Sequence, residues 1–380
     1  MPDNKRHHYV PRFYLKRFSR DEKTICLYNL KSKKKVIGAS LDKQCYKDYF
    51  YGKDQILEHL LEKIETVMKS IFRLIDEIKE PPPRNSPFYQ FLIHFIAIQH
   101  GRTQYAAEAM NEMTDKMAKY ILGPMAESND IDLNKVKIGY KNVAQHSVAL
   151  NIQMYPILID LHCKLLINCT DVEFVLSDNP IVFYNKFMDF RKNGSSTGFA
   201  SKGLQIFFPI DPHNLILLYD HIIYRVGKDN ENVIKITDAG DIHEINTLQT
   251  CSSLDNIYFL DQDFNCNSLH KKAEPFLRKI KANVVAFSEY KNKQSKSKLL
   301  AISNEDIRTN LHLSFLTIRK SAKEWRDKLR SQGLRPSDIV RNEQLCKDFE
   351  EFSDAVKQKQ YNIDDFLNFL NDKYKSQLTT

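Results

Sequence analysis

Near its start the chain reads Arg6-His7-His8-Tyr9-Val10-Pro11-Arg12-Phe13-Tyr14-Leu15-Lys16-Arg17-Phe18-Ser19. These fourteen residues include two histidines, four arginines or lysines and four aromatic residues. Full burial of a large apolar side chain stabilises a protein by about 1.5–3 kcal/mol, so this density of aromatic residues predicts burial. We expect the segment to dock on a core and to hold its cations and imidazoles close to that core.

A second stretch, Leu176-Ser177-Asp178-Asn179-Pro180, complements the first one chemically because it offers a carboxylate. Pro180 restricts Asn179 to extended geometry, so Asp178 stands where a strand is interrupted. Functional side chains are often presented at the ends of strands. The alternative is that Asp178 only makes an Asx turn with its own backbone.

The composition is that of a globular protein, with 42% hydrophobic and 27% charged residues among 380. The formal net charge of +8 is concentrated at one end, because residues 1–35 hold eleven Lys or Arg and three acids. A basic patch can attract an anionic partner such as nucleic acid. For the second half of this region the alternative is a solvated lysine-rich turn at residues 31–35.

The seven cysteines are odd in number and contain no C-x-x-C pair. This usage argues against a disulfide framework or a structural zinc site and favours a reducing compartment. The first residues show no apolar signal region, and no run approaches the roughly 18 apolar residues of a membrane span. We therefore expect a cytoplasmic protein with no membrane contact and no metal site.

The spacing of apolar residues predicts long helices over residues 55–79, 87–121 and 141–168. Residues 173–290 change in character, because short apolar runs alternate there with turn residues. That pattern predicts a largely antiparallel sheet with shorter helices between its strands.

The helix predicted over residues 87–121 departs from its apolar pattern at two positions. Gln99 and Arg102 fall inside the apolar stripe when the helix advances by about 100° per residue. A buried guanidinium without a partner is strongly destabilising, so Arg102 requires either a carboxylate or a polar cavity. We expect Asp178 to supply the carboxylate.

The sequence lacks three specific signatures of nucleotide-binding and hydrolytic enzymes, namely G-x-x-x-x-G-K-[ST], G-x-G-x-x-G and H-E-x-x-H. Nucleotide hydrolysis by a P-loop is therefore excluded. His7 and His8 are adjacent, and adjacent residues of an extended chain point to opposite sides, so at most one enters a given site. That one suits a general base or a phosphate ligand. The alternative is a histidine packed on aromatic rings and hydrogen-bonded to the backbone.

Five motifs follow one another along the chain: His7-His8-Tyr9-Val10-Pro11-Arg12-Phe13-Tyr14-Leu15, Gln99 with Arg102-Thr103, Ser177-Asp178-Asn179-Pro180, Phe208-Pro209 and Ile245-Asn246. This arrangement resembles the bacterial family catalogued as domain of unknown function 4238, over about residues 5–290. The resemblance carries no activity with it. It implies a cytoplasmic bacterial protein and associates the chain with defence against phage or mobile elements.

These observations predict an α+β fold in which long helices pack on a mainly antiparallel sheet and the N-terminal segment lies across their junction. We expect a single domain over residues 1–290 and a linker over residues 291–303, where lysine and serine dominate. Residues 304–380 should form a helical C-terminal appendage that binds a protein partner or a second copy of the chain.

The functional hypothesis is that charged and polar groups from these motifs converge at that junction. The expected catalytic residues are His7, His8, Arg102 and Asp178, and the expected substrate-binding residues are Arg12, Gln99, Asn179 and Asn246. Imidazole, carboxylate and guanidinium together suit acid–base cleavage of a phosphodiester, with histidine moving the proton and arginine holding the developing charge. The first hypothesis is a hydrolase, a nuclease that binds nucleic acid through its basic N-terminal region.

Two alternatives belong to other classes of protein. The same residues can form a buried polar network in a recognition or scaffold protein, or they can bind a small anionic ligand without turning it over. A catalytic site requires these groups to line an open cleft, whereas a structural network requires them to be enclosed and satisfied by one another. The sequence does not identify a cofactor.

Overall fold

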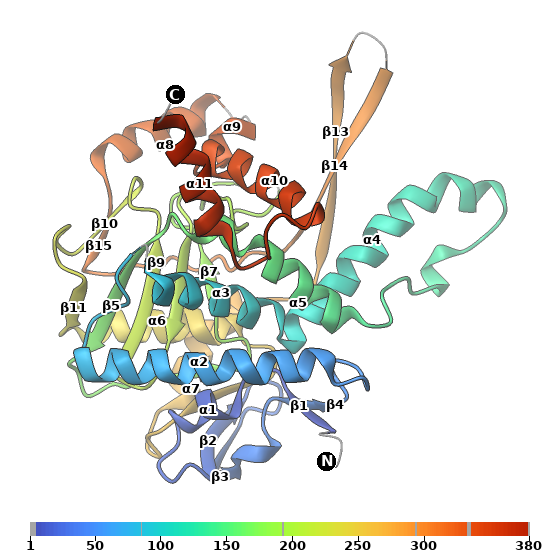
Figure 1. Cartoon of the computed structure of the whole chain (residues 1–380). Coiled ribbons are helices and arrows are strands. Elements are labelled where there is room, and N and C mark those ends of the chain that lie inside the picture. Colours follow the sequence, from blue (N-terminus) through green and yellow to red (C-terminus); the bar gives the residue numbers. More distant parts are fainter. Residues whose placement is uncertain (1–4, 85, 192–193, 293–294, 333–335, 379–380) are drawn as a thin grey trace.

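The computed structural model describes residues 5–84, 86–191, 194–292, 295–332 and 336–378. The fold is mixed α and β with mostly antiparallel sheets, which confirms the predicted fold class (Figure 1). Helices lie on both sides of a central sheet, and the last helices of the chain pack at one end of the molecule.

The central sheet is buried on both faces. Its strands are β5 (His162–Asn168), β7 (Val182–Tyr184), β8 (Gln205–Pro209), β9 (Asn214–Tyr219) and β11 (Val233–Ile236). They lie in the order β11-β5-β9-β8-β7, and only the β11–β5 pair is parallel. Every residue of β8 and β9 is buried, and their apolar side chains alternate between two separate clusters. Continuous apolar strands are what a sheet covered on both faces requires.

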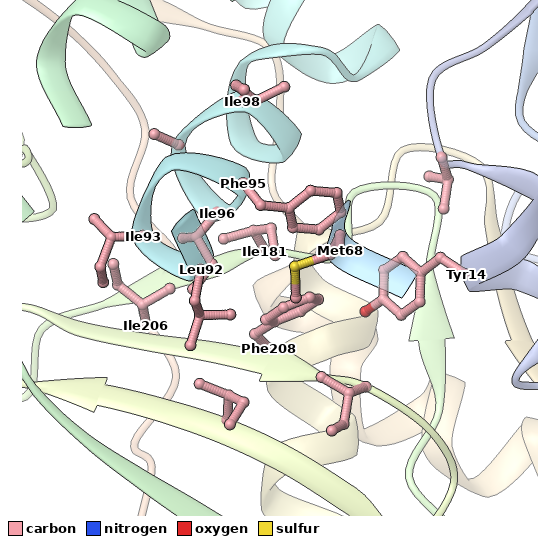
Figure 2. Close-up of a cluster of buried hydrophobic side chains, with 14 of the residues drawn as sticks. Tyr14, Met68, Leu92, Ile93, Phe95, Ile96, Ile98, Ile181, Ile206 and Phe208 are labelled. Carbon is pink, nitrogen blue, oxygen red and sulfur yellow. The ribbon is translucent and has the colours of Figure 1, made fainter. Parts of the chain in front are cut away.

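One face of the central sheet packs against the first helices of the chain. These are α1 (Arg12–Lys16), α2 (Ile56–Ile78), α3 (Pro87–Gly101) and α5 (Val143–Met154). Figure 2 shows Phe95 of α3 and Met68 of α2 gathered around Phe208 of β8, with Tyr14 of α1 at the edge. The Tyr14 hydroxyl donates to the backbone oxygen of Pro209, so the N-terminal segment docks on the sheet as predicted.

The other face is covered by later helices. They include α6 (Ala239–Ser252), α7 (Cys266–Ala273) and α8 (Lys320–Gln332). Ile242 and Leu248 of α6 belong to the same buried cluster as Leu217 of β9. The two clusters therefore enclose the sheet between an N-terminal and a C-terminal set of helices.

A second sheet joins the N-terminal hairpin to the middle of the chain. It is antiparallel and consists of β3 (Lys34–Ser40), β2 (Thr24–Asn29), β12 (Asn256–Phe259) and β6 (Leu176–Ser177), in that order. A separate pair is formed by β1 (Arg6–His8) and β4 (Tyr46–Asp48). Because Asp178 follows β6 directly, this sheet brings the two motifs that the sequence singles out into one region.

Two of the predicted helices differ from the observed elements. The helix predicted over 87–121 is broken: α3 ends at Gly101, and α4 (Gln104–Ser128) begins after Thr103, whose Oγ1 accepts from Ala106 N at 3.1 Å. A Cβ at Gly101 would lie 2.6–2.7 Å from the side chain of Asn151, so α5 packs too closely there for any larger residue.

The helix predicted over 141–168 also divides. After α5 come η3 (Tyr155–Leu158) and then strand β5, which pairs with both β9 and β11. A short apolar run cannot be assigned to helix or strand from its spacing alone, and here the pairing with distant strands decides.

The predicted linker over 291–303 falls largely within strands. Strand β13 (Ala282–Asn292) pairs antiparallel with β14 (Ser295–Asn304), and residues 293–294 lie outside the described part of the chain. This hairpin and α4 extend outward from the body of the molecule (Figure 1). A polar composition therefore did not mean the absence of secondary structure.

The C-terminal region is packed on the body. After β14 come β15 (Leu316–Ile318), which pairs with β10 (Tyr224–Val226), and then α8, α9 (Pro336–Ile339), α10 (Glu343–Lys357) and α11 (Phe366–Leu378). Phe352 and Phe366 are buried in the same cluster as α3, and Leu311 and Ala322 belong to the cluster on the other face. The apolar faces of these helices are therefore used within the chain itself.

Candidate functional site

His7 is fully buried in β1. Its Nδ1 accepts a hydrogen bond from the backbone N–H of Tyr51 at 3.0 Å. The two rings are stacked, with their centroids 5.7 Å apart and their planes at 11°. This environment matches the structural alternative for His7, a histidine packed on an aromatic ring and bonded to the backbone.

His8 points to the other side of β1, and its surroundings differ. Its ring lies beside Tyr46 with the centroids 5.8 Å apart. Burial, followed by the charge of Arg12, lowers the pKa of His8 to about 4, so the imidazole is neutral at ordinary pH. The buried Nε2 atom has no hydrogen-bond partner among the described residues.

Arg102 is buried at the junction between α3 and α4, and the carboxylate that meets it is not Asp178. Its Nη1 donates to Glu65 Oε1 of α2 at 2.9 Å, and its Nη2 donates to the backbone oxygen of His8 at 2.7 Å. The Tyr51 hydroxyl accepts from Nε at 3.3 Å and donates to the Arg102 carbonyl at 2.9 Å. The prediction that Arg102 needs an acid is confirmed, but the choice of Asp178 as that acid was wrong.

Asp178 is buried, and both of its carboxylate oxygens are occupied by the turn that follows α6. The donors are Leu254 N (2.8 Å) and Ser253 Oγ (3.0 Å) to Oδ1, and Asp255 N (2.7 Å) and Asn256 N (2.9 Å) to Oδ2. Burial raises the pKa of Asp178 to about 6, while these hydrogen bonds act in the opposite direction. The carboxylate thus fixes the entry to β12 by satisfying backbone N–H groups that would otherwise be buried without partners.

Three predicted substrate ligands are buried amides that tie one stretch of backbone to another. Gln99 Nε2 donates to Tyr9 O at 2.9 Å. Asn179 accepts from Thr103 Oγ1 at 3.0 Å through Oδ1 and donates to Ser252 Oγ at 2.8 Å through Nδ2. Asn246 donates to Glu173 O at 2.8 Å through Nδ2 and accepts from Val175 N at 3.0 Å through Oδ1. The motifs therefore do come together in space. They do so as neighbouring enclosed networks, not as the walls of a cleft.

Most cations of the basic N-terminal region are paired with acids from elsewhere in the fold. The pairs are Lys5–Asp48, Arg12–Asp42, Lys16–Glu22, Arg17–Asp76, Arg17–Asp211, Arg20–Asp261, Lys31–Asp255 and Lys33–Glu274. All of these acids except Glu22 lie outside residues 1–35. The charge excess that the sequence shows locally is thus largely compensated on the folded surface.

A basic surface lines a cavity of about 740 Å³ between α1 and α2, which we call the α1–α2 pocket. Five cations, two carboxylates and two phenylalanines line it: Arg12, Lys16, Arg17, Lys69, Arg73, Glu22, Asp76, Phe13 and Phe72. Lys69 and Arg73 are exposed on α2, one helical turn apart, and no ion pair is formed by either within the described residues. Of the predicted site residues, Arg12 is the one that faces this pocket.

Three residues that matter here were missed by the sequence analysis: Glu65, Lys69 and Arg73. All three lie on α2. The apolar spacing predicts this helix but assigns no role to its charged residues. Lys69 and Arg73 are spaced four residues apart, which places them on one face of a helix. That spacing is the signal that could have identified the pocket.

Within the described residues, no group of three or more His, Cys, Asp or Glu side chains is placed to hold a metal ion. Among the helices described, none combines the length and the apolar character that crossing a membrane requires. The α1–α2 pocket itself is lined by cationic, acidic and aromatic side chains.

Comparisons with known proteins give one match. No curated protein and no solved structure matches the chain. A family model matches residues 6–263, a span that runs from β1 to just beyond β12 and includes the motif with His7 and His8 as well as Asp178. The chain belongs to the family described as "Protein of unknown function (DUF4238)".

Proposed function

We propose that this protein binds nucleic acid at the α1–α2 pocket as a recognition protein and does not cleave it. One observation carries the proposal: Lys69 and Arg73 stand side by side on α2, exposed and without an acidic partner among the described residues, opposite the cations of α1. Two ammonium or guanidinium groups one helical turn apart suit the phosphates of a nucleic acid backbone.

The cations of α1 support the same proposal. In the pair Arg12–Asp42 the side chains are 52% and 56% exposed, and in Lys16–Glu22 they are 38% and 69% exposed. Ion pairs this exposed contribute about 0–1 kcal/mol, so a phosphate can replace the carboxylate at little expense. Arg12 and Lys16 are therefore available to a bound anion.

The burial of the predicted catalytic groups argues for binding without cleavage. Arg102 and Asp178 are 2% and 3% exposed, and each is already bonded to groups of the fold. An acid–base mechanism requires the proton-transferring group to come within hydrogen-bond reach of the substrate. Arg102 is better explained as part of a network that fixes the junction of β1, α2 and α3, and Asp178 as a support for the turn that follows α6.

Cleavage remains the second candidate because of one atom, Nε2 of His8. It lacks a hydrogen-bond partner among the described residues, and the pKa of about 4 keeps this imidazole in its neutral, basic form. If the strand pair β1–β4 opens to substrate, this nitrogen is the group that can accept a proton.

Fluorescence anisotropy with labelled single-stranded RNA and DNA tests the binding. We expect the double variant Lys69→Glu/Arg73→Glu to bind at least about tenfold more weakly than the natural chain at moderate salt. The slope of log affinity against log salt should fall by about 1.4, because each lost phosphate contact contributes about 0.7 for single strands. Lys69→Glu alone should also bind more weakly, whereas Lys63→Glu, the same single charge change on another face of α2, should bind normally. Equal loss in these two single variants would point to net charge alone and contradict the pocket.

Gel assays on the same labelled strands test the second candidate. We expect the strands to remain intact with the natural chain, with and without divalent metal. Cleavage that disappears in His8→Ala, without a change in melting temperature, would replace the recognition proposal by the nuclease hypothesis.

A further inference from the structure

An aromatic ring lies in the α1–α2 pocket beside the unpaired cations. Phe13 is only partly buried, and the Lys69 ammonium stands 5.4 Å from the centroid of its ring. On its inner side the ring packs against Phe72 and Phe95, at centroid distances of 5.8 and 6.3 Å. The core therefore holds Phe13 in place while part of the ring remains available in the pocket.

Arg17 forms a fixed wall of the pocket and is not free to bind an anion. Its Nε donates to the Ile210 carbonyl at 2.7 Å, its Nη1 and Nη2 to Asp76 at 2.8 and 2.9 Å, and its Nη2 to Asp211 at 2.6 Å. Its guanidinium also lies over Phe72, 4.9 Å from the ring centroid. The second aromatic ring of the pocket is thus covered, and an incoming ligand meets Phe13, Lys69 and Arg73.

We propose that the α1–α2 pocket holds one unpaired nucleotide, with its base against Phe13 and its phosphate between Lys69 and Arg73. This inference rests on the proposed function and names the part of a nucleic acid that is recognised. Base stacking on an aromatic side chain combined with cations for the phosphate is the general chemistry of single-strand binding. A cavity of about 740 Å³ lies within the usual range of ligand pockets, about 300–1,000 Å³.

Other anionic ligands would use only one of the two features of the pocket, its cations or the ring of Phe13. Inorganic phosphate or a sugar phosphate engages the cations but leaves Phe13 without a stacking partner. A double helix engages the cations through its backbone, but its bases are already stacked on one another and cannot reach a ring inside a pocket. An unpaired nucleotide satisfies both parts of the pocket, either as a free mononucleotide or as a unit of a single strand.

Calorimetric titration of the full chain with adenosine monophosphate and with ribose 5-phosphate tests the inference. Because stacking contributes about 1–3 kcal/mol per base, the nucleotide should bind at least about fivefold more tightly. Titration with a short single-stranded oligoadenylate separates the two sources of the ligand. Tighter binding of the oligonucleotide identifies a strand as the ligand, and comparable binding identifies the free nucleotide.

Variants at Phe13 and Lys69 separate the stacking from the charge. Phe13→Leu should lose the preference for the nucleotide but keep its affinity for ribose 5-phosphate, whereas Phe13→Tyr, which retains the ring, should keep the preference. Lys69→Glu should weaken both ligands. If Phe13→Leu does not fold, the comparison of the two ligands on the natural chain still decides whether the base contributes to binding.

Two results would overturn the inference in distinguishable ways. Equal affinity for the nucleotide and for ribose 5-phosphate, with RNA still bound through Lys69 and Arg73, would remove the stacked base but leave the proposed function standing. If the substitutions at Lys69 and Arg73 do not weaken RNA binding, both the stacked base and the proposed function are contradicted.

Discussion

Arg102 connects four elements of the fold through one guanidinium and one carbonyl. It follows α3, pairs with Glu65 of α2, donates to the backbone of His8 in β1, and exchanges bonds with the Tyr51 hydroxyl beyond β4. A cation at the C-terminal end of a helix also interacts favourably with the helix dipole. These contacts assign Arg102 to the assembly of the N-terminal half.

Replacing Arg102 by Met should lower the free energy of unfolding by about 3–5 kcal/mol, because Glu65, the His8 carbonyl and the Tyr51 hydroxyl lose their buried partner. Urea denaturation measures this change. In a double-mutant cycle, Arg102→Met and Glu65→Gln should couple by more than about 0.5 kcal/mol, because the two residues are in direct contact.

The matched control for this cycle is Asp178→Asn. Asp178 bonds to a different segment, so its effect should add to that of Arg102→Met within about 0.5 kcal/mol. Strong coupling of Arg102 to Asp178, with little coupling to Glu65, would restore the pairing expected from the sequence and contradict the observed contacts.

At the scale of single residues, physical chemistry predicted the need for a partner but not its identity. A guanidinium in an apolar stripe requires an acid whatever the fold, and that requirement holds for Arg102. The chain offers 48 acidic residues, and the choice depends on how α2 crosses α3. The stripe of α2 was visible in the sequence, yet its crossing position follows only from the packing of the whole N-terminal half.

At the scale of elements, α10 and α11 show how the C-terminal region is held. Phe366 of α11 is fully buried, and its ring lies 5.1 Å from that of Phe352 on α10. Gln90 of α3 donates to the Asp364 carbonyl at 2.7 Å and to the Tyr155 hydroxyl at 3.0 Å. The two helices therefore complete the core around α3.

Phe366→Ala should destabilise the whole chain by about 3–5 kcal/mol, the usual loss when a buried aromatic side chain is removed. Thermal and urea denaturation should show one transition at lower temperature or denaturant. Phe276→Ala, at a position where the phenylalanine is 41% exposed, is the control and should change stability by much less. An early separate transition for Phe366→Ala, with the main one unchanged, would indicate an independent appendage.

Among the elements, those whose pattern depends on local spacing were predictable. The long helix α2 follows from the periodicity of its apolar residues. Residues 141–168 divide into helix and strand because β5 is selected by its pairing with β9, over 40 residues away. Most of the predicted linker lies in the strands of a hairpin, β13 and β14. Here too the pairing between strands decides, because it compensates for a polar composition.

At the scale of the whole molecule, the distribution of charge could not be read from the sequence alone. The first 35 residues carry a strong positive excess, but acids from β4, α2, the turn before β12 and other parts of the fold meet most of these cations. The surface that remains basic is completed by Lys69 and Arg73, which lie far along the chain. Only the folded arrangement places them beside Arg12 and Phe13.

The whole molecule also carries a set of histidines that burial keeps neutral. Burial lowers the pKa of His8, His94, His100 and His162 to about 4 from an ordinary value of 6.5. His100, for example, is stacked on Phe183 with the ring centroids 4.1 Å apart. These residues come from the middle and the C-terminal end of α3 and from two different strands, so their titration reports on several parts of the fold.

Because the folded pKa values of these histidines are depressed, their contribution to stability is present above pH 6.5 and is lost as the pH falls toward 4. Burial acts in the opposite sense on Glu58 and Asp178, whose pKa values rise to about 7 and about 6, so these acids stabilise the fold more at low pH. The four histidines act against the two acids as the pH falls, and because they are more numerous we expect a net loss of stability between pH 6.5 and 4.5.

Urea denaturation across this pH range measures the loss. His100→Gln, which cannot be protonated there, should flatten the curve by its own share, whereas replacing the exposed His59 should leave the curve unchanged. A midpoint that stays constant or rises as the pH falls would mean that the buried acids dominate, and that the histidines are protonated in the folded chain.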